Sequence, residues 1–205
     1  MNNCTHNWKH IFVKESADID PQPGYPSYKP GQVIFDNHLT ALNFALSDGW
    51  ELNLNTPLDL HRMLTRDIDF FENKNQSGKY REVDVWIGHE ICPSSILIPD
   101  LMYRWLKFTN NLVHLNYEKK VCGILAASLS HHMFQVIHPF IDGNGRTGRL
   151  LFNKILKDCN EDPRIFFFDE REHYYLEIQS FREFYWNGYT FDMDAICHHY
   201  DLPKL

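Results

Sequence analysis

His138-Pro139-Phe140-Ile141-Asp142-Gly143-Asn144-Gly145-Arg146-Thr147-Gly148-Arg149 is the stretch that decides the fold. It places a base, a carboxylate, three glycines, an amide and two guanidinium groups within twelve residues. Apolar residues at helical spacing precede it over 121–137 and follow it over 150–156. The proline after His138 disfavours helical geometry at that histidine. We therefore expect a polar loop between two buried helices.

The composition of this loop predicts an anion site. Asp142-Gly143 and Asn144-Gly145 are turn dipeptides, and successive turn amides can converge on an anionic oxygen. The following helix adds unpaired N–H groups at the positive end of its dipole. Arg146 and Arg149 lie three residues apart on one helical face, which favours a clamp for a polyphosphate.

Two further residues of the loop suggest chemistry. His138 beside two arginines is expected to stay neutral near pH 7, as a general base must. Asp142 would repel a phosphate directly, but a bridging Mg²⁺ would let it hold one. Each residue alone fits a loop of turn residues with solvated charges. Their joint occurrence makes that alternative the weaker one.

The whole chain narrows the possible classes of protein. It has 205 residues, 43% of them hydrophobic, and a formal net charge of −7. The acidic balance and the absence of a basic run argue against a nucleic-acid or anionic-membrane surface. The five cysteines form no C-x-x-C pair, so neither a zinc ribbon nor a disulfide framework is indicated. Without a signal peptide or spanning run, we expect a cytoplasmic protein, although export as an effector stays open.

Helical periodicity covers most of the chain. It predicts helices over about 36–47, from Thr56, from Pro99, over 119–137 and after the loop, then C-terminal helices within 170–205. Residues 1–34 contain four prolines and are expected to form an irregular arm. The rest, 35–205, is predicted to be one domain with its core at 55–157.

One β signal interrupts the helices. Val83, Val85 and Ile87 alternate with polar residues, and Ile96 and Ile98 alternate again after a turn region. The fold class is therefore all-α with one short β-hairpin. The hairpin is either a surface ornament or a flap whose free edge binds a peptide segment by adding a strand.

The loop resembles the signature of the Fic family, His-x-Phe-x-Asp-Gly-Asn-Gly-Arg-x-x-Arg, at every specified position. Leu60-His61, the stretch 78–81 and His132 before the loop also resemble family features, so the resemblance covers about 55–157. It implies a helical bundle with a β-hairpin flap. It also implies an enzyme that moves AMP from ATP to a Ser, Thr or Tyr hydroxyl of a target protein.

Site roles follow from the resemblance position by position. His138 resembles the catalytic base and Asp142 the Mg²⁺ ligand. The residues that resemble the anion hole and the phosphate ligands are Gly143, Asn144, Gly145, Arg146 and Arg149. The residues that resemble the target-docking flap are Lys79, Tyr80, Arg81, Val83, Val85 and Ile87. Tyr174 and Tyr175 resemble a nucleotide-base pocket, with core packing an equal alternative.

The transferred group is expected to be AMP. Family members that phosphorylate replace the second glycine by lysine and lack the final arginine, whereas Gly145 and Arg149 are both present here. This favours attack on the α-phosphate and release of pyrophosphate. Transfer of UMP or phosphocholine, removal of AMP, and a non-catalytic nucleotide- or partner-binding module stay open.

Regulation is the last expectation. Many family members carry an inhibitory Ser/Thr-x-x-x-Glu-Gly/Asn helix whose glutamate pairs with the last arginine of the signature. The chain has no match, so we expect that no internal glutamate holds Arg149. The loop would then be free to bind ATP unless a separate antitoxin-like protein covers it. The target protein is the expected partner, without nucleic acid or membrane, and the oligomeric state stays open.

Overall fold

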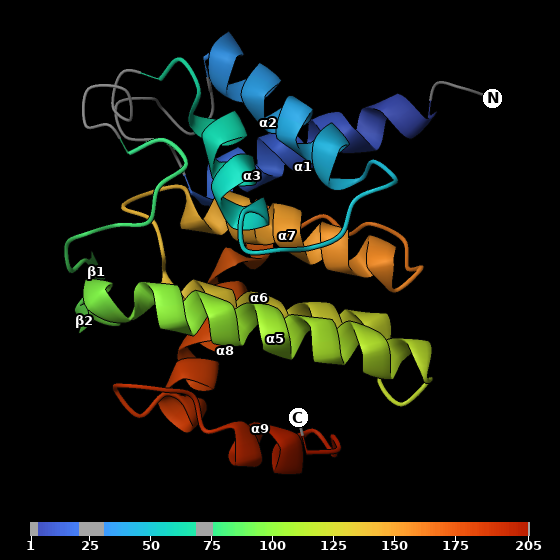
Figure 1. The fold of residues 1–205 in the computed structure, drawn as a ribbon. Coiled ribbons are helices and arrows are strands. Elements are labelled where there is room, and N and C mark those ends of the chain that lie inside the picture. The colour runs from blue at the N-terminus through green and yellow to red at the C-terminus, as the bar shows by residue number, and fades with distance from the viewer. Residues whose placement is uncertain (1–3, 21–30, 69–75, 205) are drawn as a thin grey trace.

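Two neighbouring helices, α6 (Gly123–Ile137) and α7 (Asn144–Asp158), form the centre of the molecule and are joined by the loop at 138–143. The computed structural model describes residues 4–20, 31–68 and 76–204. Helix α5 (Ile98–Tyr117) packs against α6 (Figure 1). The loop therefore lies at one end of a helical pair that is covered by other elements.

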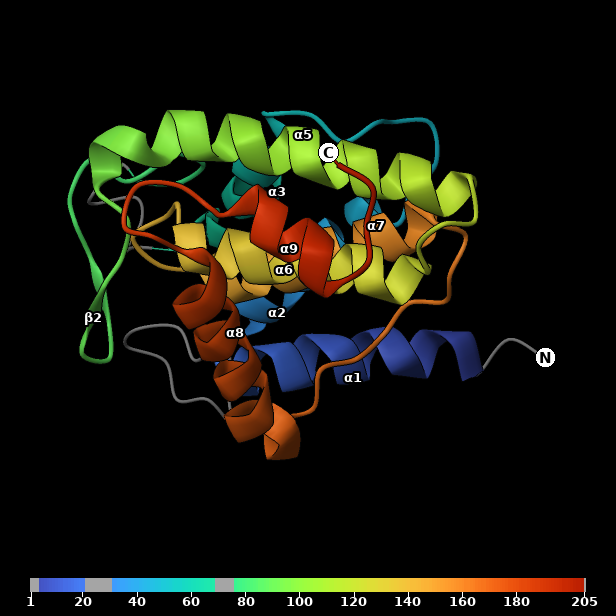
Figure 2. The same ribbon diagram turned by 90° about the horizontal axis from the view of Figure 1, so that it is seen from below.

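The remaining helices surround this pair. Helices α2 (Gln32–Ala45) and α3 (Thr56–Thr65) contact each other and α7, and α1 (Cys4–Ile19) contacts α2 and α7. On the opposite side of the pair, α8 (Arg171–Tyr185) contacts α6, and α9 (Met193–His199) contacts α8 (Figure 2). Two 3₁₀ turns precede α5 and α8, at Ser95–Leu97 and Phe168–Glu170. None of the described helices is both long and apolar enough to cross a bilayer.

Helix α6 is buried on almost every side, as its apolar composition predicts. Its buried Ser130 is paired with α5 inside the core. The Trp105 indole N–H donates to the Ser130 carbonyl at 3.0 Å, and the Ser130 hydroxyl lies 2.7 Å from that of Thr109. These bonds join α5 to α6 and keep the buried hydroxyls satisfied.

The prediction of an irregular arm over 1–34 is wrong for its first half, because residues Cys4–Ile19 form helix α1. This helix ends before Pro21, so the prolines bound it and do not disrupt it. Phe12, Val13 and Ala17 are buried at helical spacing. This spacing indicates a helix, but the prediction of an irregular arm rests on the prolines that follow it. The prolines at 21, 23, 26 and 30 lie outside the described residues.

The all-α class with one β-hairpin is confirmed, but the hairpin is shorter than predicted. Strands β1 (Trp86–Ile87) and β2 (Glu90–Ile91) pair antiparallel. The predicted second strand around Ile96 and Ile98 is wrong. Ile96 lies in a 3₁₀ turn and Ile98 begins α5, because Pro99 is favourable at the first turn of a helix.

Trp105 provides a test of the α5–α6 contact. Its side chain is fully buried, so Trp105→Ala should lower the free energy of unfolding by about 4 kcal/mol. Trp105→Phe keeps most of the apolar volume and should cost about 1–2 kcal/mol. The control is Tyr117→Ala on the same helix, at an 88% exposed residue, which should change stability by less than about 0.5 kcal/mol. Urea unfolding measures all three, and equal effects of the two alanine variants would contradict the packing.

Candidate active site

His138 ends α6 in an unusual backbone conformation. Its φ is +50° and its ψ is 60°, and its N–H still donates to the Phe134 carbonyl at 3.0 Å. The end of the helix before Pro139 is as predicted, but the residue is left-handed where extended geometry is the usual outcome. Such a conformation costs about 1–3 kcal/mol and persists only when its surroundings fix it.

Arg81 is the residue that fixes it. Its Nε donates to the His138 carbonyl at 2.8 Å, and its backbone N–H donates to the Pro139 carbonyl at 2.9 Å. Its remaining guanidinium nitrogens donate to the carbonyls of Val83 and Pro93, one on each leg of the flap. Arg81 is 2% exposed. It therefore anchors the flap to the loop at 138–143, and its burial leaves little of it for contact with a target, so its part in docking stays a prediction.

Asn144 closes the loop on itself. Its side chain accepts from the Phe140 N–H and donates to the Phe140 carbonyl, both at 2.8 Å. Gly143 precedes it with φ +80°, a backbone conformation that favours glycine. Phe140, fully buried, stacks on His61 at 3.9 Å between ring centroids. The polar half of the loop is thus fixed by hydrogen bonds and its apolar half by the core.

His61 on α3 is a site residue whose role the sequence did not indicate beyond a family likeness. Its Nδ1 accepts from the Gly78 N–H at 2.9 Å, so its Nε2 carries the hydrogen and donates to the Asp142 carbonyl at 3.0 Å. Burial lowers the pKa of His61 to about 3, so the ring stays neutral. It positions the backbone of Asp142, the predicted Mg²⁺ ligand.

The phosphate site stays a prediction, and two features of the structure bear on it. Helix α7 begins at Asn144, so the backbone amides of residues 144–146 stand at its positive end. The Arg146 guanidinium is buried, lies 3.5 Å from an Asp142 carboxylate oxygen, and its Nε has no partner among the described residues. A buried cation with an unused donor is a site for an additional anion.

Arg149 already has such a partner. It is fully buried, and Ser16 of helix α1 together with Asp20, the residue after that helix, supplies three acceptors to its guanidinium. The Ser16 hydroxyl accepts from Nε at 2.8 Å, the Ser16 carbonyl from Nη2 at 2.7 Å, and the Asp20 carboxylate from Nη1 at 3.0 Å. An acid from the N-terminal segment thus occupies the arginine expected to face the terminal phosphate.

The Asp20 carboxylate reaches into the anion site itself. One of its oxygens would lie only 1.6 Å from a Cβ built on Gly145, so only a glycine permits this approach. Its other oxygen accepts from the Tyr175 hydroxyl at 3.0 Å. Burial alone would raise the pKa of Asp20, but Arg149, Tyr175 and Arg146 outweigh burial and hold that pKa below its usual 3.8. Asp20 is therefore an anion at neutral pH.

The expectation that the loop stays free unless another chain covers it is therefore corrected. The described residues place no glutamate on Arg149, but an aspartate takes that position. Ser16-Ala17-Asp18-Ile19-Asp20 keeps the serine and the spacing of the inhibitory pattern, but departs from it at the acid and again at the next position, where Pro21 replaces Gly or Asn. The pattern specifies a glutamate, so it does not match this stretch. An irregular arm, as predicted for 1–34, would also not be expected to contain an inhibitory helix.

The other predicted site residues are divided between core and surface. The Tyr174 ring is buried below the Arg149 guanidinium at 5.9 Å, and its hydroxyl lies 3.0 Å from His131 Nε2. Tyr175 is 43% exposed and contacts α1, since its hydroxyl also donates to the Ile19 carbonyl. The nucleotide-base pocket at these tyrosines stays a prediction.

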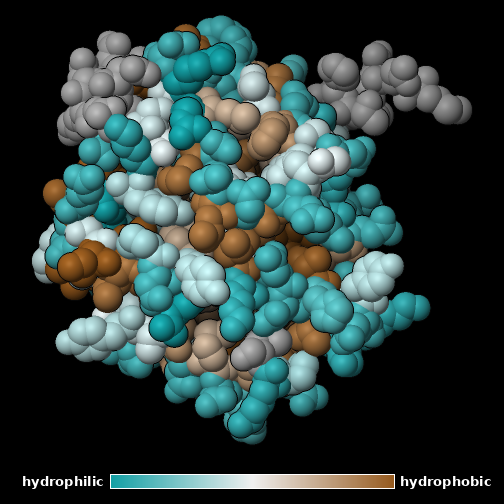
Figure 3. Space-filling model, in the orientation of Figure 1, coloured by the Kyte–Doolittle hydropathy of each residue, from teal (hydrophilic) through white to brown (hydrophobic). Residues whose placement is uncertain are grey.

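The flap residues outside its anchor are accessible. Lys79, Val83 and Ile87 are exposed, whereas Tyr80 and Val85 are half-buried. Apolar residues colour the hairpin brown at the edge of the space-filling view (Figure 3). This surface is available for an apolar partner segment, although its role in docking stays a prediction.

The surroundings of His138 keep its ring neutral, the form that can accept a proton. The pKa of His138 is lowered to about 4, chiefly by burial and also by the Arg81 and Arg182 charges, while the Asp20 carboxylate acts in the opposite direction. The ring is therefore neutral at pH 7 and able to accept a proton. This agrees with the role expected from the sequence.

The donor set around Asp142 is suitable for Mg²⁺. Its side chain is 27% exposed at the mouth of the anion site. One carboxylate oxygen lies 3.5 Å from the Arg146 guanidinium, and the other accepts a hydrogen bond from the Gly143 N–H. Magnesium in phosphate sites commonly takes one or two carboxylates and completes its shell with phosphate oxygens and water. Asp142 would be that carboxylate, and the described residues contain no larger cluster of potential metal ligands.

The Asp20 pKa leads to a pH-dependent stability prediction. Because the folded-state pKa is depressed, the stabilisation by Asp20 is complete above the unfolded pKa of about 3.9 and is lost as pH falls through the folded value. Asp20→Asn should therefore lower the unfolding free energy at pH 7 by about 2 kcal/mol, less than for a fully buried pair because the carboxylate is 31% exposed. This difference from wild type should shrink below about pH 4. A difference that is constant from pH 7 to pH 3 would contradict the ion pair.

Comparison with known proteins agrees with the geometry. The protein adenylyltransferase Fic of Drosophila grimshawi is 34% identical over 139 residues, which are 65% of this chain and 26% of that protein. The chain thus spans about a quarter of the length of the curated relatives it matches. A Fic domain containing signaling protein from Bacteroides thetaiotaomicron shares the fold with a TM-score of 0.71 at 17% identity, covering 88% of this chain and 74% of that one.

A second solved structure, Fic-1 from C. elegans, gives a TM-score of 0.67 at 21% identity over 88% of this chain and 56% of that one. The family model described as Fic/DOC matches residues 51–156, more than half of the chain. That range contains the loop, α6, all but the last two residues of α7, His61 and the flap. The chain belongs to the Fic/DOC family.

Proposed function

We propose that this protein is a protein adenylyltransferase, which transfers AMP from ATP to a hydroxyl of a target protein. One observation carries the proposal. A neutral His138 stands beside the α7 anion site, and Arg81 holds that histidine and the flap in one hydrogen-bonded unit. A base, a polyphosphate site and a surface for a polypeptide acceptor therefore adjoin one another. The curated relatives named as adenylyltransferases support the same activity.

The proposed reaction assigns a task to each group. ATP would lie with its phosphates on the α7 amides, Arg146 and Arg149. His138 would take the proton of the acceptor hydroxyl as its oxygen attacks the α-phosphorus. The bond from that phosphorus to the bridging oxygen would break, and pyrophosphate would leave. A bound Mg²⁺ at Asp142 would neutralise part of the phosphate charge.

Asp20 would restrain this reaction. Its carboxylate occupies Arg149 and lies against Gly145, where a nucleotide phosphate is expected. Two anions cannot share that guanidinium without strong repulsion, so ATP would bind productively only after α1 releases it. We propose that an internal carboxylate takes the inhibitory part that a separate antitoxin-like protein would otherwise play.

Removal of AMP from a modified protein is a second candidate, and Asp20 is the observation that favours it. That reaction needs an acidic group near the phosphates to orient the attacking water, and Asp20 supplies one. The two candidates make opposite predictions for the loss of this carboxylate. AMP transfer should rise without Asp20, whereas AMP removal should fall.

A labelling experiment tests the proposal. The chain is incubated with Mg-ATP carrying label at the α- or the γ-phosphate, and label on protein is measured, including self-modification. We expect α-label transfer, raised at least tenfold by Asp20→Asn because Arg149 then lacks the carboxylate that repels the nucleotide phosphates. His138→Ala in the Asp20→Asn background should reduce transfer at least 10²-fold, through loss of the general base.

Two controls separate chemistry from folding. His199→Ala removes a histidine far along the chain on α9 and should leave transfer unchanged. Asn144→Ala breaks the loop closure and should reduce transfer although His138 remains. Transfer of the γ-label would indicate phosphorylation, and no transfer from ATP by the Asp20→Asn variant would contradict the proposed donor.

A further inference from the structure

The two edges of the flap are not equivalent, because a side chain from α8 covers one of them. Arg182 places its Nε 2.7 Å from a Glu90 carboxylate oxygen, and its Nη2 donates to the Ile91 carbonyl. The Arg182 side chain is only 17% exposed, so both contacts are partly shielded from water. Arg182 thus joins β2 to a helix that packs on α6 and not on the flap.

The strand register identifies the groups that face outward. The Cys92 N–H donates to the Val85 carbonyl at 2.9 Å across the hairpin, so these two residues form a hydrogen-bonded pair. In an antiparallel ladder the next pair, Trp86 and Ile91, directs its own N–H and C=O groups away from the partner strand. Ile91 directs them toward the β2 edge and Trp86 toward the β1 edge.

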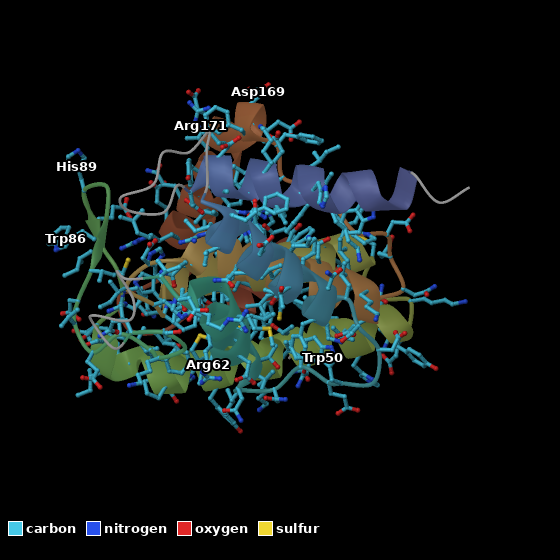
Figure 4. All side chains as sticks on the ribbon, turned by 90° about the horizontal axis from the view of Figure 1, so that it is seen from above. Trp50, Arg62, Trp86, His89, Asp169 and Arg171 are labelled. Carbon is cyan, nitrogen blue, oxygen red and sulfur yellow. The ribbon has the colours of Figure 1, made fainter. Side chains whose placement is uncertain are left out.

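These outward groups differ in their partners. The Ile91 carbonyl accepts from Arg182, which also blocks the approach of another strand to β2. The Trp86 backbone has no hydrogen-bond partner among the described residues. Its side chain is 64% exposed and projects away from the body of the molecule (Figure 4). The β1 edge is therefore the side of the hairpin where both outward backbone groups stay unpaired, beside an exposed aromatic ring, whereas on the β2 edge only the Ile91 N–H is left.

We propose that Arg182 is a positioning residue for the acceptor: it ties the flap to α8 and closes the β2 edge, so that an extended segment of the target protein joins the β1 edge at Trp86. This inference rests on the proposed function. The partner is a polypeptide segment in β conformation, whose backbone pairs with Trp86 and whose apolar side chain covers the indole.

The contacts of Arg182 with Glu90 and Ile91, which we call the clasp, matter because the hairpin is small. Two paired residues on each strand give a ladder that is marginal by itself in water. Arg81 holds the base of the flap to the catalytic loop, and Arg182 holds β2 near the tip. With both ends fixed, an acceptor segment would meet an ordered strand at a constant position relative to His138, which lowers the entropy cost of binding.

Hydrogen exchange tests the clasp without any target or nucleotide. The reporter is the Cys92 amide, which is protected only while the hairpin is formed. Arg182→Met should raise its exchange rate about tenfold. Glu90→Gln, which leaves the bond to the Ile91 carbonyl, should raise it about threefold. The matched control is Arg104→Met, which breaks an arginine–carboxylate pair on α5 with Asp100 and should change nothing at Cys92.

Proline substitutions test which edge accepts a strand. Trp86→Pro and Ile91→Pro each remove one outward N–H and no bond within the hairpin. Both are made in the Asp20→Asn chain, with Trp86→Ala to measure the loss of the ring alone. Transfer of α-label from ATP to the proteins of a cell extract should fall at least tenfold with Trp86→Pro and less than threefold with Ile91→Pro. Trp86→Ala should lie between them, and ATP affinity should be equal in all.

Each outcome supports or overturns the inference. Unchanged Cys92 exchange in Arg182→Met would show that Arg182 does not hold the flap. A greater loss of transfer with Ile91→Pro than with Trp86→Pro, or an equal loss with Trp86→Ala and Trp86→Pro, would overturn the edge assignment. If the Asp20→Asn chain itself transfers no label, the proposed function is contradicted, and so is the proposal that a target segment joins the β1 edge. The exchange measurement would still decide whether Arg182 holds the flap.

Discussion

The buried guanidinium of Arg149 is the constraint on which the site depends. A cation without exposed surface is stable only beside an anion and with its donors satisfied, because its hydration has been lost. Ser16 and Asp20 meet this need from a helix more than a hundred residues away in the sequence. The same requirement would favour phosphate binding by Arg149, as we propose, once Asp20 withdraws. The pairing that docks α1 on the fold is therefore also the one that a nucleotide would have to replace.

The surrounding structure holds the loop at 138–143 mainly through backbone groups, which leaves the side chains of His138 and Asp142 on the anion site. Asn144 closes the loop, His61 holds the Asp142 backbone, and Arg81 holds the strained His138 backbone by its carbonyl. Because Arg81 also bonds both legs of the flap, His138 and the flap, the proposed base and the proposed acceptor surface, are fixed relative to each other. Positional precision of this kind is what in-line transfer to a hydroxyl requires.

The sequence predicts those features that depend on neighbouring residues. Pro139 ends one helix, the Asp142-Gly143 turn precedes the next, and the spacing of Arg146 and Arg149 puts both guanidiniums at one helix end. Features that join distant segments were missed. Nothing local to Arg81 shows that it is buried among loop carbonyls, and nothing local to Asp20 shows that it reaches Arg149. The inhibitory pattern describes a glutamate, so an aspartate at the same spacing is found only once the helix has been placed.

The affinity for Mg-ATP tests most directly whether Asp20 and a nucleotide compete for Arg149. Titration calorimetry would compare the wild-type chain with the Asp20→Asn and Ser16→Ala variants at pH 7. We predict that Asp20→Asn binds Mg-ATP at least tenfold more tightly than wild type, since the phosphates no longer displace a charged group, and that Ser16→Ala gives a smaller gain. Equal affinities of wild type and Asp20→Asn would contradict the account, because the carboxylate would then lie outside the nucleotide's binding site.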